Sequence, residues 1–489
     1  MQRSEVSSPA IGQTPPATRS LVRMANVIIL GIALSSMGAY VGTYFIGRTG
    51  LFRILPLSIG IIMLASLRLP ATAKINVALC CFSAALAVYA TEVYFTFSST
   101  PRSIGQFPKL PDSFDIRSAL EVVSDLRNQG LDAHGELAGR LLLVAGRSSL
   151  ASESGAILPL GGISRKLTVF CNETGHYVTY QSDEHGFNNP PGIWPRRPVS
   201  IAAVGDSFAQ GFCTDPDQTF MALIRNRFPE TLTLGMVGSG PLLELAALKE
   251  YLTAIKPKTV LWFFFEANDL QDLGDESQSP LLMKYVKQDG FSQGLIDKQA
   301  EIDRAWTQYE ADLLSNWTKH RAPRWLRPMT DWLTDLTVEH KTRNRTARIL
   351  RLREVRGRLE ARFGRRSDEA AQLPLLRQTL AQAKETVNSW GGSLHFVFLP
   401  GMELLVNPHS VRAQLAQLVL QQPESLGIPV IDVRTSFQSH SIASIFFYPD
   451  SHYSELGAGL VASAVLSSLE HGPAPNEHLQ SVAAHEVMR

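Results

Sequence analysis

The chain has 489 residues, with 46 basic and 45 acidic side chains and a formal net charge of +1. This length allows more than one domain. A net charge so close to zero provides no overall field that would draw the protein to nucleic acid, so we predict no nucleic-acid partner. Apolar residues are unevenly spread, and nearly all the long apolar runs fall in the first hundred residues.

The N-terminal part is predicted to be a tail followed by a membrane region. Residues 1–24 are rich in Ser, Pro and Thr, and we expect them to be disordered. Residues 25–97 contain three apolar stretches, which we interpret as three transmembrane helices. The alternative is one membrane anchor with two buried helices. The stretches are Val27–Gly47, Ile54–Leu67 and Ile75–Phe95.

Basic residues near the first span indicate its orientation. Arg3, Arg19 and Arg23 precede it, which favours a cytoplasmic N-terminus. Three crossings then place everything after about residue 97 outside the cytoplasm. We therefore expect a multi-pass protein of a bacterial inner membrane, with its larger part facing the periplasm.

Residues 98–194 are predicted to form juxtamembrane helices and a hairpin. Apolar residues at helical spacing predict a helix over 114–129, and residues 131–144 are expected to continue it. Alternating apolar and polar residues over 166–180 predict a β-hairpin.

The segment from residue 195 to 470 alternates apolar strands with amphipathic helices. This pattern predicts an α/β domain whose parallel sheet is covered by helices on both faces. The alternation stops over residues 272–370, which we interpret as a helical insertion outside the sheet. Residues 471–489 are expected to form a C-terminal tail. The predicted strands are 199–204, 232–237, 259–265, 394–399 and 429–433.

The insertion combines basic residues with tryptophans. Basic amphipathic helices with tryptophan are typical of segments that lie at a membrane surface. The alternative is a solvated helical hairpin. The tryptophans are Trp306, Trp317, Trp325 and Trp332.

Cys171 and Cys213 are the only cysteines outside the predicted membrane region. An even pair in an oxidising compartment indicates a disulfide, and we predict that these two are bridged. The alternative is two unrelated buried thiols.

Polar residues that follow the predicted strands are the candidates for a catalytic site. Ser207 follows the first strand, and Asp450 and His452 precede the last predicted helix. A serine needs a base to become a nucleophile, and the base needs an acid to orient it. We therefore predict that His452 takes the proton of Ser207 and that Asp450 orients the imidazole. The alternative for Asp450 and His452 is a pair of metal ligands.

Three groups are candidates for stabilising an oxyanion. Acyl transfer passes through a tetrahedral oxyanion, which needs hydrogen-bond donors already in place. The backbone N–H groups of Ser207 and Gly238 and the side-chain amide of Asn268 are the predicted donors. Gly205–Gly211 alone would also fit a phosphate-binding turn.

These residues resemble the sequence blocks of the SGNH hydrolases, also called GDSL esterases or lipases. Gly205-Asp206-Ser207-Phe208 is similar to the first block, and Gly238, Asn268 and His452 are similar to the second, third and last. The resemblance covers about residues 195–470. It implies a flavodoxin-like three-layer sandwich with strand order 2-1-3-4-5.

One departure concerns the acid. Family members usually carry it three residues before the histidine, where this chain has Pro449, whereas Asp450 stands two residues before His452. This spacing resembles the alginate O-acetyltransferase branch of the superfamily.

Together with the apolar stretches, the resemblance implies a membrane-anchored serine esterase acting on O-acyl esters of an extracytoplasmic glycan or lipid. We predict no cofactor and no metal. An O-acyltransferase that modifies an envelope polysaccharide, working with other envelope-polysaccharide machinery, is the first alternative. A non-catalytic glycan-binding module of the same fold is the second.

Overall fold

The computed structural model describes most of the chain in two compact units. One unit contains residues 1–100 and 342–364, and the other contains 101–341 and 365–489. The described residues are 16–45, 51–98, 114–115, 117–194, 198–320, 352, 355, 369–448 and 451–471.

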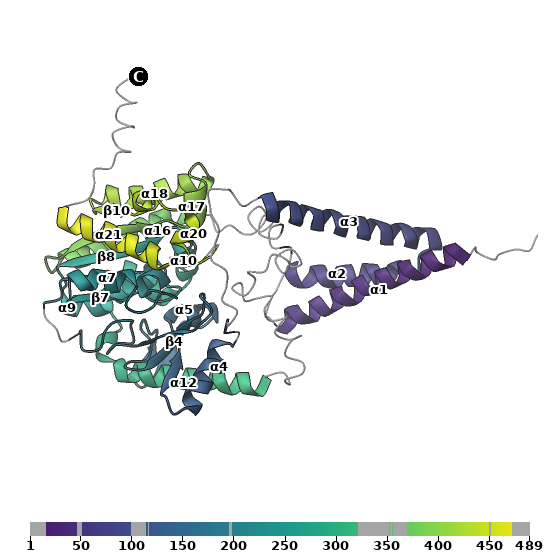
Figure 1. The fold of residues 1–489 in the computed structure, drawn as a ribbon. Helices are drawn as coiled ribbons and strands as arrows, with labels where there is room; N and C mark the ends of the chain where they lie inside the picture. The colour runs from purple at the N-terminus through teal and green to yellow at the C-terminus, as the bar shows by residue number, and fades with distance from the viewer. Residues whose placement is uncertain are drawn as a thin grey trace, which may run out of the picture. The chain divides into compact units, whose positions relative to one another are not determined.

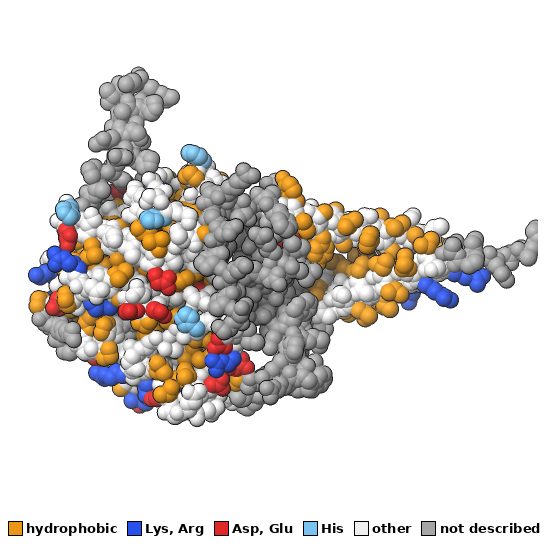
Figure 2. Space-filling model, viewed as in Figure 1, with side chains coloured by type: hydrophobic (Ala, Val, Ile, Leu, Met, Phe, Trp, Pro, Cys, Tyr) orange, Lys and Arg blue, Asp and Glu red, His pale blue; other side chains and the backbone are white. Residues whose placement is uncertain are grey.

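The first unit contains the helices α1 (Pro16–Phe45), α2 (Leu51–Ser66) and α3 (Ala71–Ser98) (Figure 1). Arg19–Tyr40 and Ala71–Phe95 are long and apolar enough to cross a membrane, whereas the apolar stretch Ile54–Ser66 is shorter. Figure 2 shows apolar side chains along these helices, and Val27 is 69% exposed. The predicted apolar helices are thus present, and two of them have the length of a membrane span.

The second unit is built around a five-stranded sheet in which every pair of neighbours is parallel. The neighbours run in the order β10-β9-β8-β6-β7. The predicted α/β fold with a parallel sheet is confirmed. Its strands are β6 (Ile201–Val204), β7 (Thr231–Thr233), β8 (Thr259–Phe265), β9 (Ser393–Leu399) and β10 (Val430–Asp432).

Alternate side chains of β8 enter two separate hydrophobic cores, one on each face of the sheet. Trp262 and Phe264 belong to one core, whereas Leu261 and Phe263 belong to the other, and all four are fully buried. Side chains of a strand alternate between faces, so helices must cover both sides. The first core includes α8 (Pro241–Ala247), α16 (Leu373–Asn388) and α18 (Val411–Ser425); the second includes α7 (Phe220–Arg227) and α21 (Glu455–His471).

A smaller sheet, in the order β1-β4-β5, precedes the large one along the chain. Its strands β4 and β5 form the predicted antiparallel hairpin. The expected continuation of a helix through 131–144 is wrong, because β1 pairs there with β4. Gly130 has a φ of +85°, which ends the preceding helix and lets the chain turn into β1. The elements are α4 (Ala119–Asn128), β1 (Ala133–Gly135), α5 (Gly139–Val144), β4 (Leu167–Cys171) and β5 (Val178–Gln181).

Helices α10 (Asp269–Glu276), α11 (Pro280–Lys287) and α12 (Gln299–His320) follow β8. Within α12, Trp306 is fully buried and its Nε1 donates to the carbonyl of Gly161 at 2.9 Å. This residue is therefore part of the core and does not lie at a membrane surface. Trp325 and Trp332 lie outside the described residues.

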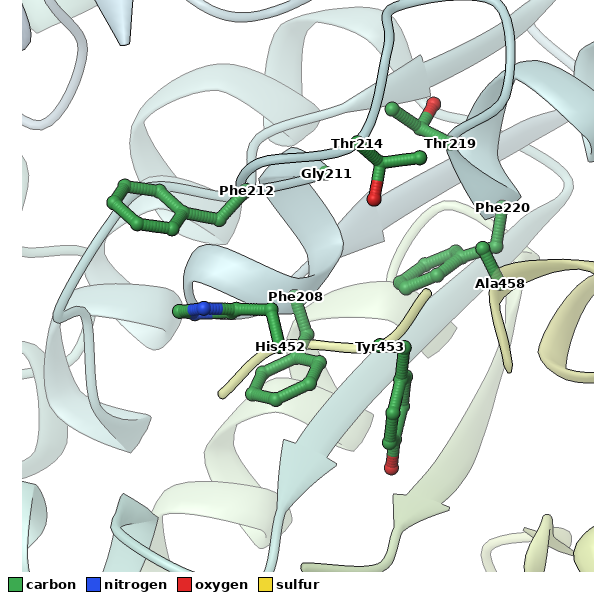
Figure 3. Close-up of a pocket in the computed structure, with 9 residues that line it drawn as sticks. All are labelled: Phe208, Gly211, Phe212, Thr214, Thr219, Phe220, His452, Tyr453 and Ala458. Carbon is green, nitrogen blue, oxygen red and sulfur yellow. The ribbon is translucent and has the colours of Figure 1, made fainter. Parts of the chain in front are cut away.

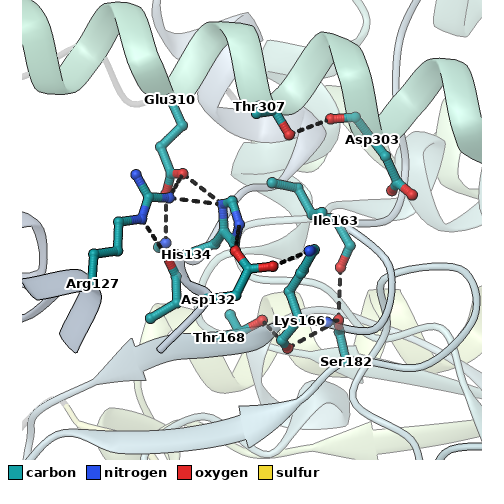
Figure 4. Close-up of polar contacts among 12 residues, drawn as sticks. Arg127, Asp132, His134, Ile163, Lys166, Thr168, Ser182, Asp303, Thr307 and Glu310 are labelled. Carbon is teal, nitrogen blue, oxygen red and sulfur yellow. Dashed lines mark hydrogen bonds and ion pairs between the residues drawn. The ribbon is translucent and has the colours of Figure 1, made fainter. Parts of the chain in front are cut away.

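A buried ionic cluster fastens α12 to the smaller sheet (Figure 4). Glu310 of α12 accepts from the backbone N–H of Gly135 at 2.7 Å and lies 2.7 Å from His134 Nδ1. Arg127 of α4 pairs with the same carboxylate at 2.5 Å. Burial raises the pKa of Glu310, but its hydrogen bonds and positive neighbours hold the pKa below its ordinary value.

The turn before Ser207 predicts a steric effect on stability. A Cβ added at Gly205 would lie 2.7 Å from Ala209 Cβ and 3.0 Å from Phe263 Cβ, whereas one at Gly459 in α21 meets no atom within 4 Å. Gly205→Ala is expected to destabilise the domain by about 1–3 kcal/mol through overpacking. Gly459→Ala is expected to stabilise it by about 0.5–1 kcal/mol. Thermal unfolding followed by tryptophan fluorescence tests both, and equal midpoints for the two variants would contradict the packing argument.

Candidate active site

Ser207 begins a short helix at the carboxyl end of β6. Asp206 caps this helix, α6 (Ser207–Gln210), because its Oδ1 accepts from the backbone N–H of Phe208 at 2.9 Å. Gly211 ends the helix with a φ of +85°, a conformation that favours glycine. The resulting tight turn holds Ser207 at the edge of the sheet, where its side chain reaches His452.

His452 lies between a serine and a glutamate. Its Nε2 is 2.8 Å from Ser207 Oγ, and its Nδ1 is 3.0 Å from Glu173 Oε1. The backbone N–H of His452 also donates to Glu173 Oε2 at 3.3 Å. With a proton on Nδ1, the ring donates to Glu173 and presents an acceptor nitrogen to the serine hydroxyl.

Glu173 has the position that the sequence analysis assigns to Asp450. Its side chain is 2% exposed, and it lies on the loop between β4 and β5. Asp450 lies outside the described residues. Sequence reasoning missed Glu173 because the acid was sought beside the histidine, whereas the small sheet brings this one from 279 positions away.

Two phenyl rings flank the imidazole. The centroid of the His452 ring lies 4.7 Å from that of Phe208 and 4.6 Å from that of Phe212. Figure 3 shows both rings beside His452, along a small pocket that is also lined by Phe220 and Tyr453. The rings restrict the rotation of the imidazole, so its orientation is set by packing as well as by hydrogen bonds.

Gly238 and Asn268 follow β7 and β8, the two strands that flank β6, at the carboxyl edge of the sheet. Gly238 lies between β7 and α8 with a φ of +70°, and Gln210 Oε1 accepts from the backbone N–H of the preceding Val237 at 2.6 Å. Asn268 directly precedes α10, and its buried Oδ1 has no hydrogen-bond partner among the described residues. Their predicted role as oxyanion donors stays a prediction.

Buried carboxyl groups lie around the base of the site. Burial raises the pKa of Asp206 to about 7 and that of Glu276 to about 8. Glu276 has a structural task, since it accepts from the backbone N–H groups of Gly240 and Leu242 at 2.6 and 2.9 Å. One oxygen of Asp206, by contrast, is buried without a hydrogen-bond partner in the described part of the chain.

The predicted disulfide between Cys171 and Cys213 is present, with a Cα–Cα distance of 5.4 Å. In the ranges that the structure describes, no group of three or more His, Cys, Asp or Glu side chains is arranged to hold a metal ion.

The raised pKa of Asp206 predicts a pH-dependent stability. The ordinary pKa of this carboxyl group is 3.8, and in the folded protein the pKa is about 7. Between these two pH values the folded protein keeps the proton, whereas the unfolded chain has lost it. The stabilisation is therefore complete below the ordinary pKa and is lost as the pH rises through about 7. Asp206→Asn, which does not titrate, is expected to gain up to about 4 kcal/mol over the wild type at pH 8 and little at pH 4.

Urea unfolding of both proteins between pH 4 and 8 measures this difference, and exposed Asp217 provides the control Asp217→Asn. A constant difference between wild type and Asp206→Asn across this range would show that Asp206 does not hold the proton.

Residues 359–487 match the family model described as "SGNH hydrolase-like domain, acetyltransferase AlgX". No protein among the curated sequences is a significant match.

Three solved structures illustrate the structural similarity. An acetyl xylan esterase has a TM-score of 0.31 and 8% identity, with 55% of this chain and 99% of that chain covered. A lipase/acylhydrolase from Enterococcus faecalis has a TM-score of 0.30 and 11% identity, with 57% of this chain and 98% of that chain covered. A G-D-S-L family lipolytic protein from Veillonella parvula has a TM-score of 0.29 and 13% identity, with 56% of this chain and 98% of that chain covered.

The residues that match this family model include His452. Residues 359–487 are thus similar to an SGNH hydrolase-like domain.

Proposed function

We propose that the protein is a membrane-anchored serine enzyme that takes an acyl group from an O-acyl ester onto Ser207 and passes it to an acceptor outside the cytoplasm. The observation that carries this proposal is the continuous chain of hydrogen bonds from Ser207 Oγ through the His452 ring to Glu173, at 2.8 and 3.0 Å. These are the positions that a nucleophile, a base and an orienting acid require.

The proposed reaction begins when Ser207 Oγ attacks the ester carbonyl carbon. His452 Nε2 takes the hydroxyl proton and then gives it to the oxygen of the leaving alcohol, so that an acyl-serine ester remains. Glu173 stabilises the transient imidazolium through Nδ1–H. The N–H groups of Ser207 and Gly238 and the amide of Asn268 are the proposed donors to the oxyanion.

The acceptor decides between hydrolysis and transfer. Water gives an esterase, and a sugar hydroxyl gives an O-acyltransferase, while His452 removes the acceptor's proton in both cases. The geometry of the three residues supports either outcome. The match of residues 359–487 to a domain described as an acetyltransferase favours transfer as the second candidate function. We propose an acyl ester of an envelope glycan or lipid as the substrate class.

The proposed location depends on the apolar helices and the disulfide. Arg19–Tyr40 and Ala71–Phe95 are candidate spans, and α2 is proposed as a third crossing. Three crossings from a cytoplasmic N-terminus place the catalytic domain outside the cytoplasm. A disulfide in that domain agrees with an oxidising compartment, for which we propose the bacterial periplasm.

The nucleophile is tested with the full chain in detergent. Ser207→Ala is expected to lower the turnover of p-nitrophenyl acetate by at least about 10³-fold, because no other group forms the acyl-enzyme. Ser463→Ala, on an exposed position of α21, is the matched control and should retain wild-type turnover. Near-normal turnover by Ser207→Ala would reject the mechanism.

The same assay separates the two candidate functions. With an added oligosaccharide acceptor, a transferase is expected to yield O-acetylated sugar at the expense of acetate, whereas an esterase yields acetate alone. Both products must disappear in Ser207→Ala.

The orienting acid is tested by comparing two carboxylates. Glu173→Gln is expected to lower kcat by about 10²- to 10⁴-fold, because an amide that donates to Nδ1 favours the wrong tautomer. Asp450→Asn is expected to have a much smaller effect, since the Nδ1 hydrogen bond to Glu173 remains. Steady-state kinetics of both variants decide the assignment, and the opposite ranking would restore Asp450 as the acid.

A further inference from the structure

The disulfide joins two segments that carry catalytic groups. Cys171 is the last residue of β4 and stands two positions before Glu173, while Cys213 lies six positions after Ser207. Glu173 belongs to the loop of the small sheet, whereas Ser207 follows β6 of the large one, and among the described strands none pairs across the two sheets. Ladder hydrogen bonds therefore do not fix the distance between Glu173 and the serine side of the site.

An apolar cluster around the disulfide, which we call the bridge cluster, brings together all three catalytic segments. Its residues come from the β4–β5 hairpin that carries Glu173, from the turn that follows Ser207, and from the segment before His452. The members are Phe170, Cys171, Val178, Tyr180, Cys213, Phe447 and Tyr448, with Phe212 packed against them.

Phe212 connects the bridge cluster to the imidazole. Its ring centroid lies 4.8 Å from that of Phe170 and 4.6 Å from that of His452. The next residue, Cys213, has a φ of +60°, a left-handed conformation that non-glycine residues seldom adopt. Such a conformation persists where surrounding contacts enforce it, and here the disulfide is one of those contacts.

The loop that carries Glu173 has its own local anchors. Asn172 Oδ1 accepts from the backbone N–H of Gly175 at 3.0 Å, and Asn172 Nδ2 donates to the carbonyl of Asp115 at 2.6 Å. These bonds stabilise the conformation of the loop itself. The covalent tie between the hairpin and the turn of Ser207 is the disulfide, and it lies beside two non-covalent contacts, Gln210 Nε2 to Tyr180 OH at 3.2 Å and His176 to Asp215 at 3.8 Å.

We propose that the Cys171–Cys213 disulfide is a positioning element of the active site, which holds the Glu173 carboxylate against Nδ1 of His452 and Phe212 against the imidazole ring. This proposal deepens the proposed function and rests on it. A displacement of about 1 Å at a catalytic contact can lower a rate about 10²-fold, so a covalent tie at this point affects turnover as well as stability.

The test is a double-mutant cycle on the full chain, with Cys171→Ala/Cys213→Ala, Glu173→Gln and the combined variant. Removal of the bridge is expected to lower kcat about 10- to 100-fold and to change KM much less. In the Glu173→Gln background, removal of the disulfide should lower kcat less than about threefold, because the contact that the disulfide supports is already lost. Additive losses, or an unchanged kcat without the bridge, overturn the proposal.

A control separates positioning from stability. Val387→Ala removes buried side-chain volume from α16, on a helix that carries no catalytic residue, and should lower the unfolding midpoint without lowering kcat. If Cys171→Ala/Cys213→Ala does not fold, Cys171→Ala/Cys213→Gly is used, since glycine accepts the φ of +60° at position 213. The same outcomes then apply to that variant.

A readout without turnover keeps this proposal distinct from the proposed function. Proton NMR of the folded protein is expected to show a downfield Nδ1–H signal of His452 that is lost in Glu173→Gln and in the bridge-free variant. If this signal persists unchanged without the bridge, the positioning role fails even though Ser207-dependent turnover stands. If the signal is lost but the wild type shows no Ser207-dependent turnover, the positioning role stands and the proposed function fails.

Discussion

The active site depends on one imidazole that makes two hydrogen bonds at once. His452 contacts Ser207 at 2.8 Å and Glu173 at 3.0 Å, and these partners stand 245 and 279 positions away along the chain. Three separate segments must therefore be held in place together for a single side chain to have the correct tautomer. The parallel sheet supplies one segment, the small sheet supplies another, and the stretch before α21 supplies the third.

Much of the fold follows from local sequence. Buried parallel strands appear as uninterrupted apolar runs, and the predicted strand 259–265 coincides with β8. Functional groups of such folds collect after strand ends, and this rule predicts three of the candidate residues. In the structure, Ser207 follows β6, Gly238 follows β7 and Asn268 follows β8. In these cases the signal lies within a few residues of the side chain concerned.

The remaining features are set by tertiary contacts that leave no local pattern. Glu173 lies 279 positions from His452, and it is brought near by the β4–β5 hairpin together with the Cys171–Cys213 disulfide. Because of the pairing of β1 with β4, residues 131–144 form the strand β1 followed by α5, and not the expected continuous helix. Composition alone groups Trp306 with the tryptophans of a membrane-surface segment, but its hydrogen bond to Gly161 and its burial place it in the core.

The origin of Glu173 bears on where the functional domain begins. A fragment starting near residue 195 would retain all five strands of the large sheet together with Ser207 and His452. It would lack β1, β4, β5 and the glutamate between the last two strands. In the proposed mechanism, the hairpin that precedes the large sheet is therefore part of the catalytic unit. A fragment that keeps this glutamate in its packed environment extends back to α4, whose Arg127 joins the ionic cluster that holds α12 against β1.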